Sequence, residues 1–407
     1  MDFLFQHHFL KKLLLLTVLT MVCGTISAQS YQPGEVYFSD HDYIEYRAGN
    51  MPLIIAVPHG GYENPESIPD RTCNSPVYVR DAYTLELGQL IDSVFEIQYG
   101  CRPHMIINHL DRRKLDANRN FEDAACGNTE AEHAWQAFHY FIDEAKSIVE
   151  QDFDRGLFID LHGHGHWNQR LELGYMLLGT TLAFSDNQLN QPAIVNYSSI
   201  KKLVGDNLNS YTHSELLRGD FSFGAMMKNR QYASVPSPQD PHPSFGELYF
   251  SGGYNTKIHG SSDGGKIDGI QLECNMTGVR DSHENRQAFA GALTEGLVQY
   301  LEVHYFGNDN FIQCATSTTE ISKPELSNIL TYPNPSAGFV NIQLDEQLDL
   351  NNTNLVIYDL KAAVIYQRPL EDHRFMLNLH GKISPGKYLL VIEHPQKTFR
   401  QPIIVLD

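Results

Sequence analysis

Two histidine-rich segments directly follow apolar runs of strand length. Pro58-His59-Gly60-Gly61 follows the run 53–57, and His162-Gly163-His164-Gly165-His166 follows the run 157–161. Two imidazoles, one carboxylate and an open position are the ligand set of a catalytic zinc ion, which lowers the pKa of bound water to about 7. We therefore predict one zinc ion per chain, with His59 and His162 as ligands.

The third zinc ligand has three candidates. Glu63 lies one helical turn after His59, Asp81 lies at the start of a predicted helix, and His164 lies two residues after His162. Each of them offers an oxygen or nitrogen donor that zinc accepts. The sequence leaves these three alternatives open.

Glu273 is the candidate proton carrier. It closes the apolar run 270–272, where an unpaired carboxylate is costly. A carboxyl group there fits a general base and acid that moves a proton from bound water to a leaving amine. A buried ion pair with an arginine explains Glu273 equally well.

Residues 110–119 gather three arginines and one lysine in an otherwise acidic chain. Such a cluster is either a solvated face or a clamp for a substrate carboxylate, because the guanidinium fork matches a carboxylate in bidentate fashion. Taken alone, the cluster favours the solvated face.

Alternation of strands and helices must position these groups. Apolar runs at 53–57, 105–107, 157–161 and 270–272 alternate with helix-periodic stretches around 83–94 and 135–145. This alternation predicts an α/β domain with a largely parallel sheet. Since ligands bind beyond the carboxyl ends of such strands, we expect four strands to bring ionisable groups to one edge.

The chain divides into four parts. Residues 1–28 have the lysines, apolar run and small-residue cleavage site of a signal peptide. Residues 29–305 form the α/β domain, and 306–328 have the composition of a linker. Residues 329–407 contain six short alternating runs separated by turn residues, which predict a small β-sandwich.

Charge and cysteine content exclude several classes of protein. With 49 acidic and 30 basic residues the formal net charge is −19, which disfavours binding to nucleic acid or anionic membranes. No apolar run after residue 28 approaches the ~18 residues of a membrane helix, so no transmembrane segment is expected in the mature chain. Five cysteines remain after residue 28, so at least one is unpaired, and one or two disulfides are compatible with export.

The first domain resembles the N-formylglutamate amidohydrolases, which belong to the wider group of zinc carboxypeptidase-like amidohydrolases. The resemblance covers roughly residues 46–303, and its blocks occur in the order of the family. The matching segments are 57–61, Asp81 with 83–87, Asp116-Ala117-Asn118-Arg119, Asp160-Leu161-His162-Gly163-His164, 252–254 with 259–260, and 269–273.

This resemblance implies an α/β/α sandwich, a three-layer fold with a mostly parallel mixed sheet, that hydrolyses an amide of a small acidic amino-acid derivative. It implies that His59 and His162 bind the metal, that Asp81 or Glu63 completes the set, and that Glu273 shuttles the proton. Arg119 would anchor a substrate carboxylate, with Asn118 and Arg113 beside it as further substrate-binding residues. Asp160 would fix one histidine ring.

Gly60 and Gly163 stand where family members tend to carry serine or alanine, and His164 and His166 are additional. An exported enzyme also has no evident place in histidine catabolism. We therefore expect an acyl-amino acid, a peptide or a cell-wall fragment as substrate in place of formylglutamate.

The last eighty residues resemble the type A C-terminal sorting domain of the type IX secretion system, which implies an Ig-like β-sandwich. The alternative is an ordinary adhesive or stabilising β-sandwich. The matching segments are 332–336 with Gly338, 356–360 and 383–388. This resemblance implies that the secretion machinery is a partner, and that the protein crosses the periplasm of a Gram-negative bacterium to be secreted or held at the cell surface. Two functions follow: an exported metal-dependent amidohydrolase, or a surface binding or adhesion protein that has lost catalysis.

Overall fold

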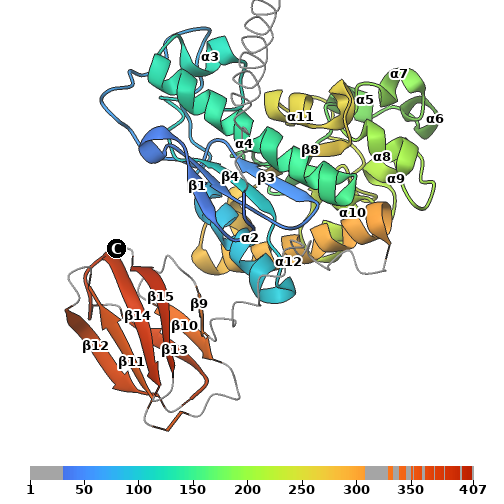
Figure 1. Ribbon diagram of the computed structural model, residues 1–407. Helices are drawn as coiled ribbons and strands as arrows, with labels where there is room; N and C mark the ends of the chain where they lie inside the picture. The colour runs from blue at the N-terminus through green and yellow to red at the C-terminus, as the bar shows by residue number, and fades with distance from the viewer. Residues whose placement is uncertain are drawn as a thin grey trace, which may run out of the picture.

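The computed structural model describes residues 31–307 and, in the C-terminal part, residues 329–332, 339–344, 350–351, 353–359, 363–370, 372–379, 381–394 and 397–405 (Figure 1). The predicted signal peptide and residues 308–328 of the predicted linker lie outside the described residues.

An eight-stranded mixed sheet forms the centre of the first domain, with the order β1-β2-β4-β3-β5-β8-β6-β7. The neighbours β4, β3, β5 and β8 pair in parallel, whereas β2 pairs with β4 and β6 pairs with β8 in antiparallel fashion. The predicted mixed sheet with a parallel centre is therefore confirmed. Its strands are β1 (Val36–Phe38), β2 (Ile44–Arg47), β3 (Leu53–Val57), β4 (His104–Asn108), β5 (Gly156–Gly163), β6 (Leu171–Gly174), β7 (Ser234–Val235) and β8 (Ile267–Cys274).

Helices cover both faces of this sheet, because its central strands are apolar on both sides. Ile55 of β3 faces a core that includes α2 (Thr84–Tyr99) and α12 (His283–Leu301). Ile54 faces a second core under α4 (Thr129–Phe153). Figure 1 shows α4 in front of the sheet and α2 with α12 below it. The predicted three-layer α/β/α sandwich is confirmed.

The sequence explains why α4 forms and which face it buries. The side chain of Asn128 accepts a hydrogen bond from the backbone N–H of Ala131, which caps the first turn. Phe138, Ile142 and Ala145 recur at intervals of three or four residues and are fully buried against the sheet. These are three of the residues from which the helix was predicted.

Short helices fill the chain between β6 and β8, where the sequence predicted no regular elements. Each has four to seven residues, which is too short for a helical period to be recognised. They are α5 (Gly179–Leu182), α6 (Asp186–Leu189), α7 (Pro192–Val195), α8 (Lys201–Asp206), α9 (His213–Arg218), α10 (Phe223–Asn229) and α11 (Tyr254–His259). The single turn η2 (Ser261–Asp263) follows α11 in the same region. Outside it lie α3 (Phe121–Ala125) and the single turns η1 (Asp40–Asp42), η3 (Met276–Arg280) and η4 (Glu302–Phe306).

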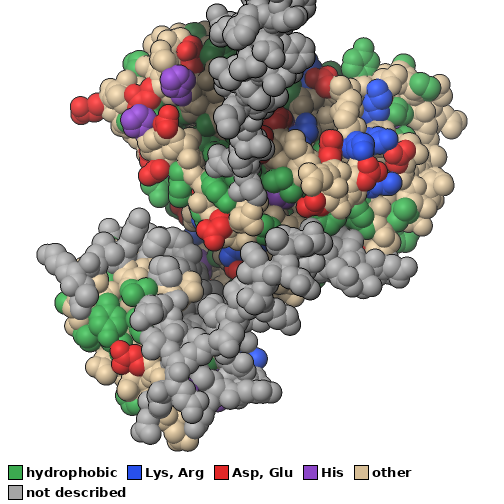
Figure 2. Space-filling view, in the orientation of Figure 1, with side chains coloured by type: hydrophobic (Ala, Val, Ile, Leu, Met, Phe, Trp, Pro, Cys, Tyr) green, Lys and Arg blue, Asp and Glu red, His purple; other side chains and the backbone are tan. Residues whose placement is uncertain are grey.

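Charged side chains on these short helices pair with opposite charges. Lys202 pairs with Asp206 at 2.7 Å, and Arg218 pairs with Asp186 at 2.6 Å. On the face shown in Figure 2, blue and red side chains accordingly lie side by side over this region. No helix among the described residues is long and apolar enough to span a membrane.

The C-terminal part is a small β-sandwich, as predicted. One sheet has the order β13-β10-β9 and the other β12-β11-β14-β15, with one apolar core shared by both. The strands are β9 (Ile329–Tyr332), β10 (Phe339–Leu344), β11 (Asn354–Tyr358), β12 (Val364–Pro369), β13 (Arg374–Asn378), β14 (Gly386–His394) and β15 (Lys397–Val405). The sequence predicted six of these seven strands. It missed β9, whose four residues before Pro333 are too few to show an alternating pattern.

Candidate active site

Histidine and carboxylate side chains converge at the carboxyl ends of β3, β5 and β8. His59 follows β3, and His162 lies directly opposite Glu273 in the register of β5 and β8. These side chains line a cavity of about 430 Å³. The cavity is lined by His59, Asp81, Arg112, Asn118, Arg119, Asn120, Asp123, His162, Gly163, Phe250, Gly252, Gly253, Tyr254, Gln271 and Glu273. The predicted meeting of strand ends at one edge is thus observed for these three strands, and Arg112 brings the segment that follows β4 to the same cavity.

His59, Asp81 and His162 form a compact set of possible metal ligands. The two imidazole Nδ1 atoms lie 3.1 Å apart, and Asp81 Oδ2 lies 3.0 Å from Nδ1 of His162 and 3.5 Å from Nδ1 of His59. Zinc bonds of about 2.0–2.2 Å place the ligand atoms of a tetrahedron roughly 3.3–3.6 Å apart. The three distances are close to the edges of such a tetrahedron, so the residues present fit a zinc ion.

Two further carboxylates fix the ring nitrogens that face away from this set. Asp116 Oδ1 lies 2.6 Å from Nε2 of His59, and Asp160 Oδ2 lies 3.0 Å from Nε2 of His162. A carboxylate that accepts the Nε2 proton leaves Nδ1 with a free electron pair. A cation bound between the two rings and Asp81 would take up these Nδ1 electron pairs, whereas protons on Nδ1 donate hydrogen bonds to the carboxylate of Asp81.

Asp160 has the position predicted for a residue that fixes a histidine ring, whereas Asp116 was named only within a matching segment. Asp116 is fully buried and also pairs with Arg112 at 3.1 Å and with Arg71 at 3.6 Å. Asp116 lies in an irregular segment, so no periodic pattern in the sequence predicted its contact with His59. The four-residue spacing from Arg112 was the available signal.

Charge interactions set the protonation of the buried ligands. Burial disfavours the charged form of Asp81, but hydrogen bonds from His162 and His59 outweigh it and hold the pKa of this carboxyl well below its usual range. Burial also opposes the charged form of His162, yet Asp160 and Asp81 raise the pKa of its imidazole. Asp81 is therefore a carboxylate at neutral pH.

Backbone contacts bring Asp81 to the metal set although it lies in an irregular segment. Its N–H donates to the carbonyl of His59 at 3.1 Å, and its Oδ2 accepts from the N–H of Gly163 at 3.2 Å. The end of β5 packs so closely against the buried Arg280 that position 163 favours glycine. A Cβ at this position would lie 2.3 Å from the guanidinium carbon of Arg280. A disulfide between Cys73 and Cys126 ties the preceding loop to α3.

Glu273 is buried in the cavity wall with few compensating partners. Gln271 donates a hydrogen bond to its Oε1 at 3.0 Å. Burial raises the pKa of the Glu273 carboxyl to about 8; His162 opposes this rise, and Asp81, Glu172 and Asp160 add to it. Such a group carries a proton at neutral pH and can exchange it near the cavity. Gln271 was not predicted as a site residue.

The cationic stretch contributes two arginines to the cavity, of which only Arg119 was predicted. Arg112 and Arg119 line it, and Asn118 lies there with its Nδ2 3.2 Å from Nε2 of His162. The Nδ2 atom of Asn118 is a donor and could bond only to an unprotonated Nε2, whereas the carboxylate of Asp160 accepts from Nε2–H; we therefore place the proton on Nε2, directed at Asp160. Arg113 does not line the cavity, because its half-exposed side chain pairs with Asp111 at 3.1 Å.

Two of the three candidates for the third ligand lie elsewhere. Glu63 is exposed, and its backbone pairs with that of Leu110. His164 groups with His166 and Glu172. Its Nε2 lies 2.8 Å from the carbonyl of Arg170, and its Nδ1 accepts the N–H of His166 at 3.1 Å, so both ring nitrogens are occupied. Asp81 is thus the candidate that the structure places beside His59 and His162.

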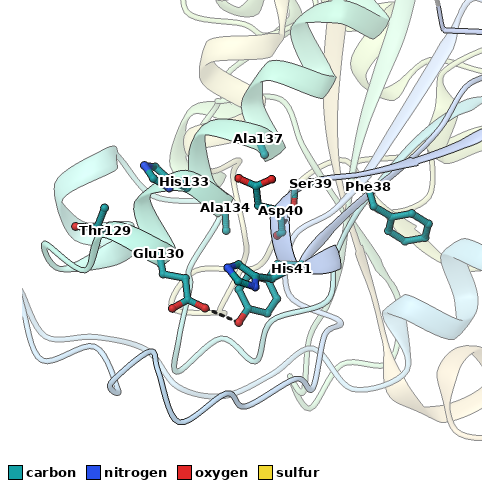
Figure 3. A pocket seen from close by; sticks show the side chains of 10 residues that line it. Phe38, Ser39, Asp40, His41, Thr129, Glu130, His133, Ala134 and Ala137 are labelled. Carbon is teal, nitrogen blue, oxygen red and sulfur yellow. Dashed lines mark hydrogen bonds between the residues drawn. The ribbon is translucent and has the colours of Figure 1, made fainter.

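A second cavity, of about 490 Å³, lies between η1 and α4 (Figure 3). Glu130 accepts a hydrogen bond from Tyr43 at 2.6 Å at its edge, and Asp40, His41 and His133 also line it. None of the predicted site residues belongs to this cavity.

Residues 330–406 match the family described as the secretion system C-terminal sorting domain. The predicted sorting domain is therefore confirmed, and it indicates export to the cell surface or secretion. No curated protein matches the chain.

Two solved structures are similar to parts of the chain. N-formylglutamate amidohydrolase from Ralstonia eutropha JMP134 is 12% identical over 64% of this chain and 97% of its own, with a TM-score of 0.39. PorZ, a surface component of the type-IX secretion system of Porphyromonas gingivalis, is 21% identical, with a TM-score of 0.18. That likeness covers 22% of this chain and 13% of PorZ. Both TM-scores are low, so the chemistry proposed below rests on the site itself.

Proposed function

We propose that the protein is an exported, metal-dependent amidohydrolase that cleaves an amide bond of a small acyl-amino acid or peptide-like substrate. One observation carries the proposal. The Nδ1 atoms of His59 and His162 converge on the carboxylate of Asp81, while buried carboxylates hold the opposite nitrogen of each ring. This arrangement matches the ligand set and the outer support of a catalytic zinc site and supports the proposal.

A zinc ion held by these three residues would supply a water molecule of lowered pKa and polarise a substrate carbonyl. In its ionised form, Glu273 would take a proton from that water and return it to the leaving amine nitrogen. Its burial supports this role, because a carboxyl with a raised pKa gives and takes protons near neutral pH. Arg119, exposed to 40% at the cavity, would bind a substrate carboxylate and orient the amide.

The test is the metal content of the purified chain by elemental analysis, with circular dichroism as a check of folding. We expect about one zinc ion per chain, lost in both His59→Ala and His162→Ala. His133→Ala, on the exposed side of α4, is the matched control and should keep the metal. A chain that neither contains zinc nor binds added zinc would support the surface-binding protein and overturn the proposed hydrolase.

A further inference from the structure

Phe250 places an exposed aromatic ring on the wall of the active-site cavity. The side chain is 42% exposed, although it lies among polar and charged lining residues. One face of the ring stacks on the imidazole of His166, with ring centroids 4.7 Å apart and an interplanar angle of 9°. His166 covers that face, and Phe250 lines the cavity with the surface that it still exposes.

The buried carboxylate of Glu172 holds both members of this stack. Its Oε1 lies 2.7 Å from Nδ1 of His166, and its Oε2 accepts the backbone N–H of Phe250 at 2.8 Å. Glu172 is 1% exposed and lies on β6 directly opposite Glu273 of β8. The sheet that positions the proton carrier thus also positions the aromatic ring.

The backbone on either side of Phe250 is fixed as well. The hydroxyl of Tyr249 donates to the carbonyl of Leu173 at 2.6 Å, and the N–H of Met176 donates to the carbonyl of Ser251 at 2.7 Å. The irregular segment 249–251 is therefore hydrogen-bonded, on both sides of Phe250, to β6 and to the residues that follow β6. An apolar surface held rigidly in its place loses little entropy when a ligand covers it.

We propose that Phe250 forms an apolar subsite that binds the side chain of the substrate, so that the enzyme prefers acyl-amino acids with an aromatic or long aliphatic side chain. The inference rests on the proposed function and narrows its substrate class. The ring offers no donor or charge to an acidic side chain, whereas an apolar group that covers its exposed surface is removed from water. Glu172 and His166 act as positioning residues, since they reach the substrate only through Phe250.

The test compares N-acetyl-L-phenylalanine with N-acetyl-L-alanine, which differ only in the side chain. In wild type, kcat/KM should be higher for the phenylalanine compound. Phe250→Ala should lower the ratio of the two kcat/KM values by about tenfold, the scale of discrimination in an apolar pocket. Glu172→Gln has one acceptor oxygen instead of two, so it can hold only His166 or the backbone N–H of Phe250. The less well positioned ring should raise KM for the phenylalanine compound and thereby lower the same ratio of kcat/KM values.

Phe245→Ala is the matched control, because Phe245 is fully exposed in the same segment and does not line the cavity. It should leave the ratio unchanged. Binding without hydrolysis separates this inference from the proposed function. Calorimetry would measure the binding of both compounds to Glu273→Gln and to the double variant Glu273→Gln/Phe250→Ala. If neither compound is hydrolysed but Phe250→Ala still weakens binding of the phenylalanine compound selectively, the hydrolase fails and the subsite stands. An unchanged ratio in both assays, or no binding of either compound at millimolar concentration, overturns the subsite.

Discussion

His162 and Glu273 lie directly opposite each other on the neighbouring parallel strands β5 and β8. Strands paired in this way keep their Cα atoms about 5 Å apart, so the candidate ligand and the candidate proton carrier share one rigid frame. The side chains of Asp160 and Gln271, two residues earlier on each strand, project from the same face. The alternation of the two strands thus assembles the candidate ligand, the residue that fixes it and the candidate proton carrier.

Replacing Glu273 with Gln should abolish most hydrolysis without loss of fold or metal. The amide keeps the size of the side chain and can still accept the hydrogen bond from Gln271, but it cannot carry the proton. We expect kcat to fall by roughly 10²–10⁴, the usual contribution of general acid–base catalysis. The measurement is kcat together with zinc content. Glu66→Gln, an exposed carboxylate outside the cavity, is the control, and a Glu273→Gln enzyme with full kcat would sink the mechanism.

Asp81 and Glu63 should differ sharply in their effect on metal binding. Asp81→Asn keeps the shape of the side chain but removes the negative charge beside the Nδ1 atoms of His59 and His162. We expect elemental analysis to find most of the zinc lost in Asp81→Asn and retained in Glu63→Gln, whose side chain is exposed. The reverse pattern would make Glu63 the third ligand and contradict the geometry described above.

Asp160→Asn should weaken zinc binding while leaving the three ligands in place. The Asp160 carboxylate lies 3.0 Å from Nε2 of His162, and Asn255 holds it through a hydrogen bond of 3.2 Å. Loss of such a partner typically lowers metal affinity 10- to 100-fold. Competition with a zinc chelator measures the change, with Asp154→Asn at an exposed ion pair as the control. An affinity equal to that of wild type would show that Asp160 does not support the ligand.

The sequence predicted the strand ends well because apolar runs before a histidine or glutamate are a local pattern. His59, His162 and Glu273 come from three such runs, and all three line the cavity. The largely parallel pairing of these strands followed from their alternation with helices. The edge at which they meet was therefore predictable without knowledge of any side-chain contact.

The residues that the sequence could not resolve lie in irregular segments. Asp81 was one of three candidates for the third ligand, because its position depends on the backbone of His59 and Gly163 and not on a periodic pattern. Arg112 lines the cavity and Arg113 does not, a difference of one residue that turn geometry decides. No sequence pattern predicted that Phe250 lines the cavity, since its position depends on the hydrogen bonds of Glu172.

Asp268, far along β8 from the cavity, should make the stability of the first domain depend on pH. Burial raises the pKa of its carboxyl to about 7, although hydrogen bonds from Ser261, Leu203 and Tyr305 act in the opposite direction. The folded pKa thus lies above the unfolded value of about 3.9, so the folded state holds a proton that the unfolded state has lost between these two values. The stabilisation from this group is complete below about pH 4 and is lost as the pH rises towards 7.

Asp268→Asn should remove this dependence, because an amide can accept from Ser261 and Leu203 through its oxygen and donate to Tyr305 without titrating. Relative to Asp268→Asn, the wild-type free energy of unfolding should fall by roughly 1.4 kcal/mol for each pH unit between 5 and 7. Urea unfolding followed by tryptophan fluorescence measures it, since Trp135 and Trp167, the two tryptophans of the chain, both lie in the first domain. Asp154→Asn, at an exposed carboxylate, should keep the wild-type slope. Parallel curves for wild type and Asp268→Asn would mean that Asp268 is ionised in the folded protein throughout this range.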